Sequence, residues 1–443
     1  MWRTGGDGPD PPDSLSAFRH SQRRDVTVLS CLRRRGRAAV AAAGVVIPLA
    51  VAGCASAGSS GAGVSCDSPG VTPTEVKVGL VYPDSGPVGA GFRYARSGVE
   101  ARIALANASG GVNGRKIVLE WRDDQGNTSG FARAADDLLR AGVFGLIAET
   151  LFVADTADRL DKEGVPVAGV PGEAVWTQHR NMFTFGSLQA AGSSVTTFGL
   201  YLRRFGATRA ALVFNDTQSR SAEGLVRLFT DSLRSQGIAV ADPIGYTPGI
   251  TSPDRVAAQI KALDADAFVG IVSGEDLPPI YTAAKRAGLT FKVALASSGY
   301  DTQFLARHGA SMAGVSVLTP HVLFTADSPA LHAYRQAVID HAPELDQTDN
   351  EIALGAYITT DEFLLGLELA GACPTRAAFI DNLRAVRDYD AGGLIPTTDL
   401  SRFGDPNLCY SFVRVNQTGT AFEVVPGVGG PDPHQWCGTR LGA

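Results

Sequence analysis

The chain alternates short apolar runs with helical patterns from Val76 onward, and this alternation constrains its fold more than any other feature. Residues 76–82 read as a strand that ends at Pro83, and a helical pattern of apolar residues follows. A second strand at 116–121 and a helix at 130–140 continue the series. Strands that alternate with helices of about ten to fifteen residues predict parallel sheets covered by helices on both faces. The sequence therefore predicts an α/β protein.

The alternation runs through the chain twice, which predicts two doubly wound lobes. A first set of strands ends near residues 185–186, and a second set begins after a helix at 193–204. Helices then dominate from 329 to 387, and two late strands at 411–416 and 421–425 predict a hairpin. The other expected strands cover 144–148, 165–170, 210–214, 238–246, 267–272, 291–295 and 314–318, and the other expected helices cover 154–163, 222–236, 253–263 and 277–287.

An arginine cluster followed by an uncharged apolar stretch precedes this part of the chain. Arginines within residues 33–37 lead into residues 38–52, a run too short to span a membrane comfortably. This pattern predicts a secretory signal over residues 1–53. The small residues before Cys54 resemble the lipobox of bacterial lipoproteins, in which the cysteine is lipidated with fatty acyl chains such as palmitate and becomes the new N-terminus. An ordinary hydrophobic anchor with a chance cysteine is the alternative.

Residues 54–74 are mostly Ser, Gly, Ala and Pro, and they predict a flexible tether between the lipidated cysteine and the globular part. Acyl chains buried in a bilayer would hold the protein at a membrane. We therefore expect an extracytoplasmic protein anchored through Cys54.

Composition and motifs exclude several classes of function. The chain is 44% apolar and 19% charged, with a net charge of −6, and it has no clustered basic stretch of the kind that binds nucleic acid. Gly-x-Ser-x-Gly, the phosphate-binding loop and the dinucleotide-binding glycine pattern are absent. The histidines between 308 and 341 lack metal-ligand spacing. We expect no enzymatic activity, no cofactor and no metal, and we expect a monomer.

Four cysteines remain after the signal and the lipidated residue are set aside. An even number in an exported protein predicts two disulfides. Three pairings are possible, and we favour Cys373–Cys409 together with Cys66–Cys437. The second bond would tie the tether to a C-terminal tail at 426–443. Metal ligation is the alternative, but no Cys-x-x-Cys pair accompanies these residues.

The order of motifs carries a family resemblance. Residues 76–124 read strand, Ser-Gly-Pro, helix, Gly-Gly-Val-Asn-Gly-Arg, strand and Asp-Asp. Residues 75–425 as a whole strongly resemble the substrate-binding proteins of branched-chain (Leu/Ile/Val-type) amino acid ABC importers, which have the type I periplasmic binding protein fold. Further matching motifs are Gly164-Val165-Pro166, Gly288-Leu289, Gly355-Ala356-Tyr357 and Gly392-Gly393-Leu394.

The resemblance implies two α/β lobes joined by three crossovers, with a ligand cleft between the lobes. The first lobe would comprise residues 75–188 and 323–392, and the second residues 189–322 and 393–425. The crossovers are expected near 187–192, 319–324 and 393–397. In open α/β sheets, ligands bind beyond the carboxyl ends of the strands, so the loops at those ends are the candidate contacts.

Two loops of the first lobe are expected to meet the ligand. The loop with Ser85, Gly86 and Phe92 offers a hydroxyl and backbone amides near a helix start, which suit a carboxylate, although a turn chosen for its geometry would look the same. The resemblance places a Ser or Thr on the ligand's carboxylate in the second loop, where this chain has Thr150 beside Leu151. A plain helix cap is the alternative for Thr150.

Two positions depart from the family pattern in charge. The loop with Gly172 carries Glu173, where family members have a small hydroxyl residue, and a carboxylate there would repel an anionic ligand end. Ser297 stands where amino acid binders have an acidic partner for the ammonium group. Tyr300 is expected either to wall the pocket or to cover the surface. These departures put a simple amino acid pose in question.

The second lobe supplies the remaining candidates. Gln218 and Arg220 occupy a loop where the family often has tyrosine, and Arg220 would add positive charge unless it is solvated. Glu275 is a candidate substitute for the missing acidic partner, with Asp276 and Asp301 as the other possibilities.

The resemblance implies a lipid-anchored solute-binding protein without enzymatic activity. It would capture a small polar ligand, an amino acid or a related molecule, by lobe closure and deliver it to ABC permease subunits. A ligand sensor or scaffold of the same fold, signalling to a membrane partner, is the alternative. A hydrolase would need a nucleophile–base pair, and the sequence offers none.

Overall fold

The computed structural model describes residues 66–190, 192–216, 219–430 and 432–442. These residues fall within one unit of contacts that spans residues 60–443. The predicted signal, the predicted lipidation site Cys54 and Gln218 lie outside the described residues.

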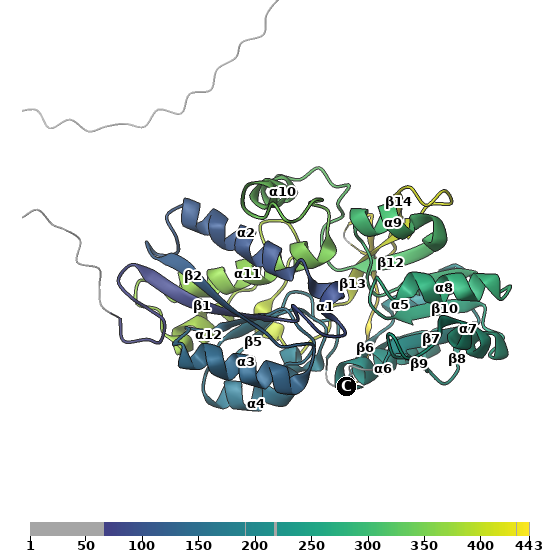
Figure 1. Ribbon diagram of the computed structural model, residues 1–443, viewed down its shortest axis with the longest axis horizontal. Coiled ribbons are helices and arrows are strands. Elements are labelled where there is room, and N and C mark those ends of the chain that lie inside the picture. Colours follow the sequence, from purple (N-terminus) through teal and green to yellow (C-terminus); the bar gives the residue numbers. More distant parts are fainter. Residues whose placement is uncertain (1–65, 191, 217–218, 431, 443) are drawn as a thin grey trace, which may run out of the picture. The chain divides into compact units, whose positions relative to one another are not determined.

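The first lobe is built on a five-stranded parallel sheet with the order β2-β1-β3-β4-β5 (Figure 1). Side chains alternate between its faces. Val78 and Leu80 of β1 pack into one hydrophobic cluster with helices α2 and α11, and Val81 packs into another with α3 and α4. The elements are β1 (Glu75–Tyr82), α1 (Gly89–Phe92), α2 (Ala95–Ala108), β2 (Lys116–Asp123), α3 (Thr128–Arg140), β3 (Leu146–Ala148), α4 (Ala154–Lys162), β4 (Val167–Gly169), η1 (Ala174–Thr177), β5 (Met182–Phe183), α10 (Pro329–His341), α11 (Glu351–Leu369) and α12 (Arg376–Leu383).

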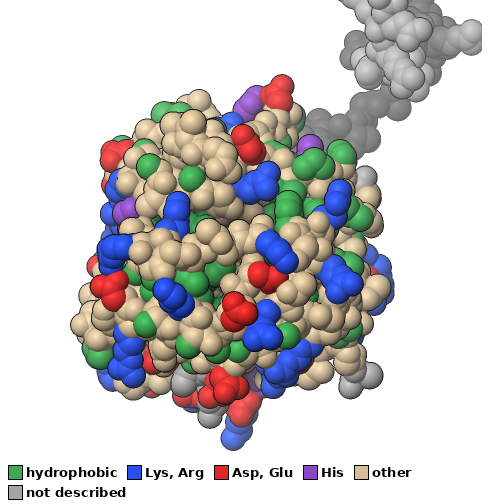
Figure 2. Space-filling model, turned by 90° about the vertical axis from the view of Figure 1, so that its right-hand side faces the viewer, with side chains coloured by type: hydrophobic (Ala, Val, Ile, Leu, Met, Phe, Trp, Pro, Cys, Tyr) green, Lys and Arg blue, Asp and Glu red, His purple; other side chains and the backbone are tan. Residues whose placement is uncertain are grey.

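The second lobe is built on a nine-stranded sheet with the main order β14-β13-β12-β11-β10-β7-β8. The strands from β7 to β12 pair in parallel, and β13 runs antiparallel to β12. Figure 2 turns this lobe toward the viewer and shows Lys and Arg interspersed with Asp and Glu on its surface. The elements are β6 (Ser194–Val195), α5 (Thr197–Arg204), β7 (Arg209–Asn215), α6 (Ser219–Ser235), β8 (Ala239–Val240), β9 (Ile244–Tyr246), α7 (Pro253–Ala262), β10 (Ala267–Ile271), α8 (Leu277–Arg286), β11 (Val293–Ala296), α9 (Thr302–Met312), β12 (Val315–Thr319), η2 (Leu400–Arg402), β13 (Cys409–Val415), β14 (Phe422–Val425), β15 (Gln435–Cys437) and β16 (Arg440–Leu441).

The chain passes between the two sheets three times. It crosses after β5, returns between β12 and α10, and crosses again between α12 and β13. The predicted crossover ranges 187–192 and 393–397 lie within these connections, and the range 319–324 begins at the last residue of β12. The predicted α/β class with two lobes and three crossovers is therefore confirmed.

Two segments differ from the sequence-based expectation. The strand predicted at 238–246 is split into β8 and β9, because Asp242-Pro243 interrupts it and proline has no amide hydrogen for a sheet ladder. The segment expected as a C-terminal tail joins the second lobe instead. Its strand β15 pairs with β13, and β16 pairs with β6.

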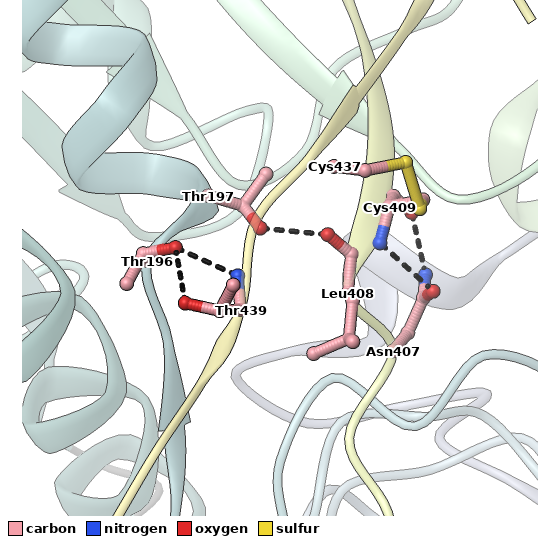
Figure 3. The surroundings of a disulfide bond; sticks show 7 residues. All are labelled: Thr196, Thr197, Asn407, Leu408, Cys409, Cys437 and Thr439. Atoms are coloured by element: carbon pink, nitrogen blue, oxygen red, sulfur yellow. Dashed lines mark hydrogen bonds between the residues drawn. A yellow bond between two sulfur atoms is a disulfide. The ribbon is translucent and has the colours of Figure 1, made fainter. Parts of the chain in front are cut away.

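The favoured disulfide pairing is wrong. The bonds are Cys66–Cys373 and Cys409–Cys437. Cys409 lies directly opposite Cys437 in the antiparallel β13–β15 pair. Beside this bond, the Asn407 amide donates to the carbonyl oxygen of Cys409, and the Thr197 hydroxyl donates to that of Leu408 (Figure 3). The favoured Cys373–Cys409 bond is excluded because the chain crosses from the first lobe to the second between these residues. Each disulfide therefore closes within one lobe.

Among the described residues, no helix is both long enough and apolar enough to cross a membrane.

Candidate functional site

A cavity of about 340 Å³ lies at the carboxyl ends of strands from both sheets. Its lining includes residues in the loops that follow strands, such as Glu149 after β3, Gly172 after β4, Ser273 after β10, Ser297 after β11 and His321 after β12. This is the location where open α/β sheets bind ligands. A volume of this size suits a small organic molecule.

Much of the cavity wall is apolar. The first lobe supplies apolar side chains from α1, the loops after β3 and β5, and the start of α11, and the second lobe supplies them from β10, α6 and α9. Such walls favour a ligand with a hydrophobic body. The side chains include Val88, Phe92, Leu151, Phe185, Leu225, Ile271, Phe304 and Ile352.

Hydrogen bonds join the two lobes at the rim of the cavity. The Ser221 hydroxyl and the Gln189 amide both donate to the carbonyl oxygen of Gly172, at 2.8 and 2.7 Å. On another side, Arg93 and Tyr94 donate to Oε1 of Gln303, at 3.1 and 2.9 Å. Polar contacts between lobes of this kind can be exchanged for water when a cleft opens.

Phe92, Leu151 and Gly172, which the sequence predicts as ligand contacts, line the cavity. Ser85 and Gly86 do not line it. The Ser85 hydroxyl donates to the Asp123 carboxylate at 2.5 Å, and Gly86 has a φ of +86°, so these two residues shape a turn.

Thr150 and Glu173 lie behind the cavity wall. The Thr150 hydroxyl is buried and donates to the Asp124 carboxylate at 2.5 Å. The Glu173 carboxylate accepts hydrogen bonds from the backbone amides of Val153 and Ala154, at 2.9 and 3.3 Å, at the N-terminus of α4. Burial raises the pKa of Glu173 to about 7. Both side chains therefore have structural partners within the lobe.

In the second lobe, Glu275 and Ser297 line the cavity. Glu275 forms an ion pair with Arg307, and Nε2 of His308 lies 3.4 Å from its carboxylate. Tyr300 is buried beneath the wall, where its hydroxyl accepts a hydrogen bond from the Phe324 amide at 2.9 Å. Burial raises the pKa of Tyr300 to about 12. The side chain of Arg220, like Gln218, lies outside the described part of the chain.

Two acidic cavity residues, Glu149 and Glu351, were not among the predicted contacts, whereas Asp276 was one of the possible substitutes for the acidic partner. Glu149 is buried, and burial raises its pKa to about 7. Asp276 accepts a hydrogen bond from the Ser273 hydroxyl at 2.6 Å. Glu351, at the start of α11, accepts from the backbone amides of Gly299 and Tyr300, at 2.5 and 3.1 Å. A charged residue directly after a buried strand was the available signal for Glu149, whereas no local pattern links Glu351 to residues 299–300.

His321 is another polar residue of the cavity wall. Its side chain is buried, and burial lowers the pKa of its imidazole to about 4. Its Nδ1 lies 2.9 Å from the carbonyl oxygen of Val322. The ring is therefore neutral at physiological pH.

Sequence comparison matches residues 75–420 to the family described as periplasmic binding protein. A Leu/Ile/Val-binding protein homolog 3 from Brucella melitensis is 24% identical over 199 residues, which are 43% of this chain and 53% of that protein. The Leu/Ile/Val-binding protein BraC3 from Rhizobium johnstonii is 27% identical over 199 residues, which are 43% of this chain and 53% of that protein. The chain thus spans about half the length of the curated relatives it matches.

Solved structures share the fold at low sequence identity. A fatty acid ABC transporter substrate-binding protein from Thermomonospora curvata has a TM-score of 0.71 at 16% identity, covering 83% of this chain and 94% of that chain. The branched-chain amino acid transporter substrate-binding protein LivJ from Streptococcus pneumoniae, in complex with isoleucine, has a TM-score of 0.65 at 18% identity, covering 80% and 99%. The type I periplasmic binding protein fold predicted from the sequence is therefore confirmed.

Proposed function

This chain belongs to the periplasmic binding protein family, and we propose from this premise that it captures one small solute between its two lobes and delivers it to an ABC permease. Membership confirms the prediction of a binding protein rather than an enzyme, and it places the protein outside the cytoplasm. The observation that carries the proposal is the cavity lined from both sheets, with hydrogen bonds between the lobes at its rim.

Lobe closure would remove the solute from water. The apolar walls would then bury its hydrophobic body, while the few polar groups orient it. We propose Phe92, Leu151, Gly172, Glu275 and Ser297 as contact residues, since all of them line the cavity. The relatives carry names that range from Leu/Ile/Val binding to fatty acid transport, which fits an apolar solute body.

Attachment to the membrane is part of the same proposal. A lipidated Cys54 and the Gly/Ser-rich segment after it would keep a monomeric binding protein at high local concentration beside permease subunits. Expression in a bacterial host that processes lipoproteins tests this point. Wild-type protein should partition into detergent and gain the mass of acyl chains, and the Cys54→Ala variant should do neither.

A solute screen tests binding itself. Thermal unfolding of the mature protein would be measured with amino acids, amides, amines, fatty acids and aromatic acids. A solute at one hundred times its Kd adds about 2.7 kcal/mol of stability, which raises the Tm measurably. A hit should bind with 1:1 stoichiometry in calorimetry. If no solute stabilises the protein, solute binding is not its function, and if a hit is not taken up by cells in a manner that depends on this protein, delivery to a permease is wrong.

A further inference from the structure

Glu149 is a buried acidic residue of the cavity wall whose carboxyl group lacks a full set of hydrogen-bond partners within the residues that the structure describes. It directly follows β3, its side chain is 2% exposed, and it lines the cavity. Its Oε1 has no hydrogen-bond partner among the described residues. Buried carboxylates in proteins are normally paired or hydrogen-bonded, because an unpaired buried charge is costly. Such a group in a ligand cavity is an acceptor available to a ligand.

The protein's own cations at the cavity are engaged elsewhere. Arg93 donates to Gln303, and Arg307 pairs with Glu275. Within the described part of the chain, no ion pair to Glu149 forms. The Thr359 hydroxyl of α11 acts on the Glu149 carboxyl and lowers its pKa, but this effect is smaller than that of burial, which raises it.

Two pairs of backbone amides near the cavity already donate to the protein's own carboxylates. The Glu173 carboxylate accepts hydrogen bonds from the amides of Val153 and Ala154 at the N-terminus of α4. The Glu351 carboxylate accepts hydrogen bonds from the amides of Gly299 and Tyr300 in the second lobe. Helix N-termini and exposed amides are the groups that bind anions in folds of this kind. An anionic ligand would therefore find carboxylates where it needs donors.

We propose that the solute is an apolar molecule with a protonated amine and no carboxylate, and that its ammonium group donates a hydrogen bond to Glu149. The inference rests on the proposed function, because it names the class of solute held in the same cavity. It makes Glu149 the residue that determines specificity for the head group, while the apolar walls accept the body.

A matched ligand series tests the head group without changing the body. The mature protein would be titrated calorimetrically with 2-phenylethylamine, phenylalanine, 3-phenylpropanoate and 2-phenylethanol, and with octylamine and octanoate as a longer pair. At least one amine should bind at least about tenfold more tightly than its carboxylate, alcohol and amino acid counterparts, as expected for hydrogen bonds to charged groups.

The Glu149→Gln variant tests the residue. It keeps the shape of the side chain and should lower the amine's affinity at least about tenfold. Glu423→Gln, at an exposed glutamate on β14, is the matched control and should bind as wild type does. If Glu149→Gln does not fold, the ligand series measured with the wild-type protein still tests the inference.

The outcomes separate this inference from the proposed function. Tighter binding of a carboxylate or of phenylalanine, equal amine binding by Glu149→Gln, or binding of no amine overturns the inference. The proposed function survives each of these results if the wider screen yields another solute that binds saturably. It fails only if nothing in the wider screen binds.

Discussion

The Ser221 hydroxyl donates a 2.8 Å hydrogen bond to the carbonyl oxygen of Gly172, and this bond joins the first turn of α6 in the second lobe to the loop after β4 in the first. Gln189, on the first crossover, donates to the same carbonyl oxygen. The rim of the cavity is thus held by side chains that come from both lobes and from the connection between them.

Ser221→Ala should weaken solute binding without unfolding the protein. The lost hydrogen bond contributes about 1 kcal/mol, so the Kd of a solute that requires closure should rise roughly fivefold. Ser235→Ala is the control, because the Ser235 hydroxyl donates to the carbonyl oxygen of Ser232 in the same helix and accepts from the side-chain amide of the adjacent Gln236. Calorimetric titration of both variants measures the difference. Equal affinities in the two variants would show that this contact does not take part in closure.

Glu173 should matter for stability. Its carboxylate satisfies the backbone amides at the start of α4, so Glu173→Ala leaves buried donors unpaired and should lower the free energy of unfolding by about 1–3 kcal/mol. Glu173→Gln keeps an acceptor oxygen and should lose less. Glu163→Ala, at an exposed glutamate beside the same helix, should change the free energy by no more than about 0.5 kcal/mol. Urea unfolding of the three variants provides the ranking, and an unchanged Glu173→Ala protein would contradict it.

Stability should fall as the pH rises from about 5 to 7. Burial raises the pKa values of Glu149, Glu173 and Glu351 to about 7, so the folded state holds protons that the unfolded state has released. Their stabilising effect is complete below the unfolded pKa and is lost as the pH passes the folded pKa. His321, whose pKa burial lowers to about 4, has the opposite effect up to about pH 6.5.

Comparing wild type with Glu149→Gln isolates one of these groups. Removing a single carboxyl should make the slope of unfolding free energy against pH less negative by about 1 kcal/mol per pH unit between pH 5 and 7. The exposed Glu423→Gln substitution should leave the slope unchanged. Urea unfolding at several pH values gives both slopes, and identical slopes for all three proteins would show that the pKa of Glu149 is not raised in the folded state.

The two disulfides should contribute unequally. Cys66–Cys373 closes a loop of 307 residues, and Cys409–Cys437 closes one of 28 residues. By loop-closure entropy, loss of the first bond should cost about 2 kcal/mol more than loss of the second. Peptide mapping without reductant would first establish the pairing, and urea unfolding of the two double Cys→Ala variants would then compare them. Equal losses would show that strain or residual structure outweighs loop length.

The sequence predicted the architecture well because local patterns encode it. Apolar runs such as Val76–Tyr82 and the helical periods between them specify parallel strands and their covering helices without knowledge of distant contacts. The position of the cavity followed from the same pattern, since loops at the carboxyl ends of strands meet in this class of fold.

The partners of individual side chains could not be predicted in this way. Glu173 meets α4 rather than a ligand, and Tyr300 meets Phe324, because the three-dimensional packing brings these residues together. The favoured disulfide pairing was wrong although the crossover expected near 393–397 already placed Cys373 and Cys409 in different lobes, because cysteine positions in sequence do not specify which thiols meet in space.

Gly91 offers the most direct test that the solute lies between the lobes. It lies in α1 and lines the cavity, and a Cβ atom built on it would lie 3.7 Å from the Cβ of Ser273 in the second lobe. Alanine fits this space in ordinary van der Waals contact. A tryptophan there would fill the gap and hold the lobes apart.

The measurement is a calorimetric titration of wild type, Gly91→Ala and Gly91→Trp with the solute identified by the screen. We predict that the first two bind it with 1:1 stoichiometry and similar affinity, and that Gly91→Trp, with an unchanged thermal unfolding transition, shows no binding. Binding by Gly91→Trp with wild-type affinity would contradict the account, because the solute would then be held somewhere other than the cleft.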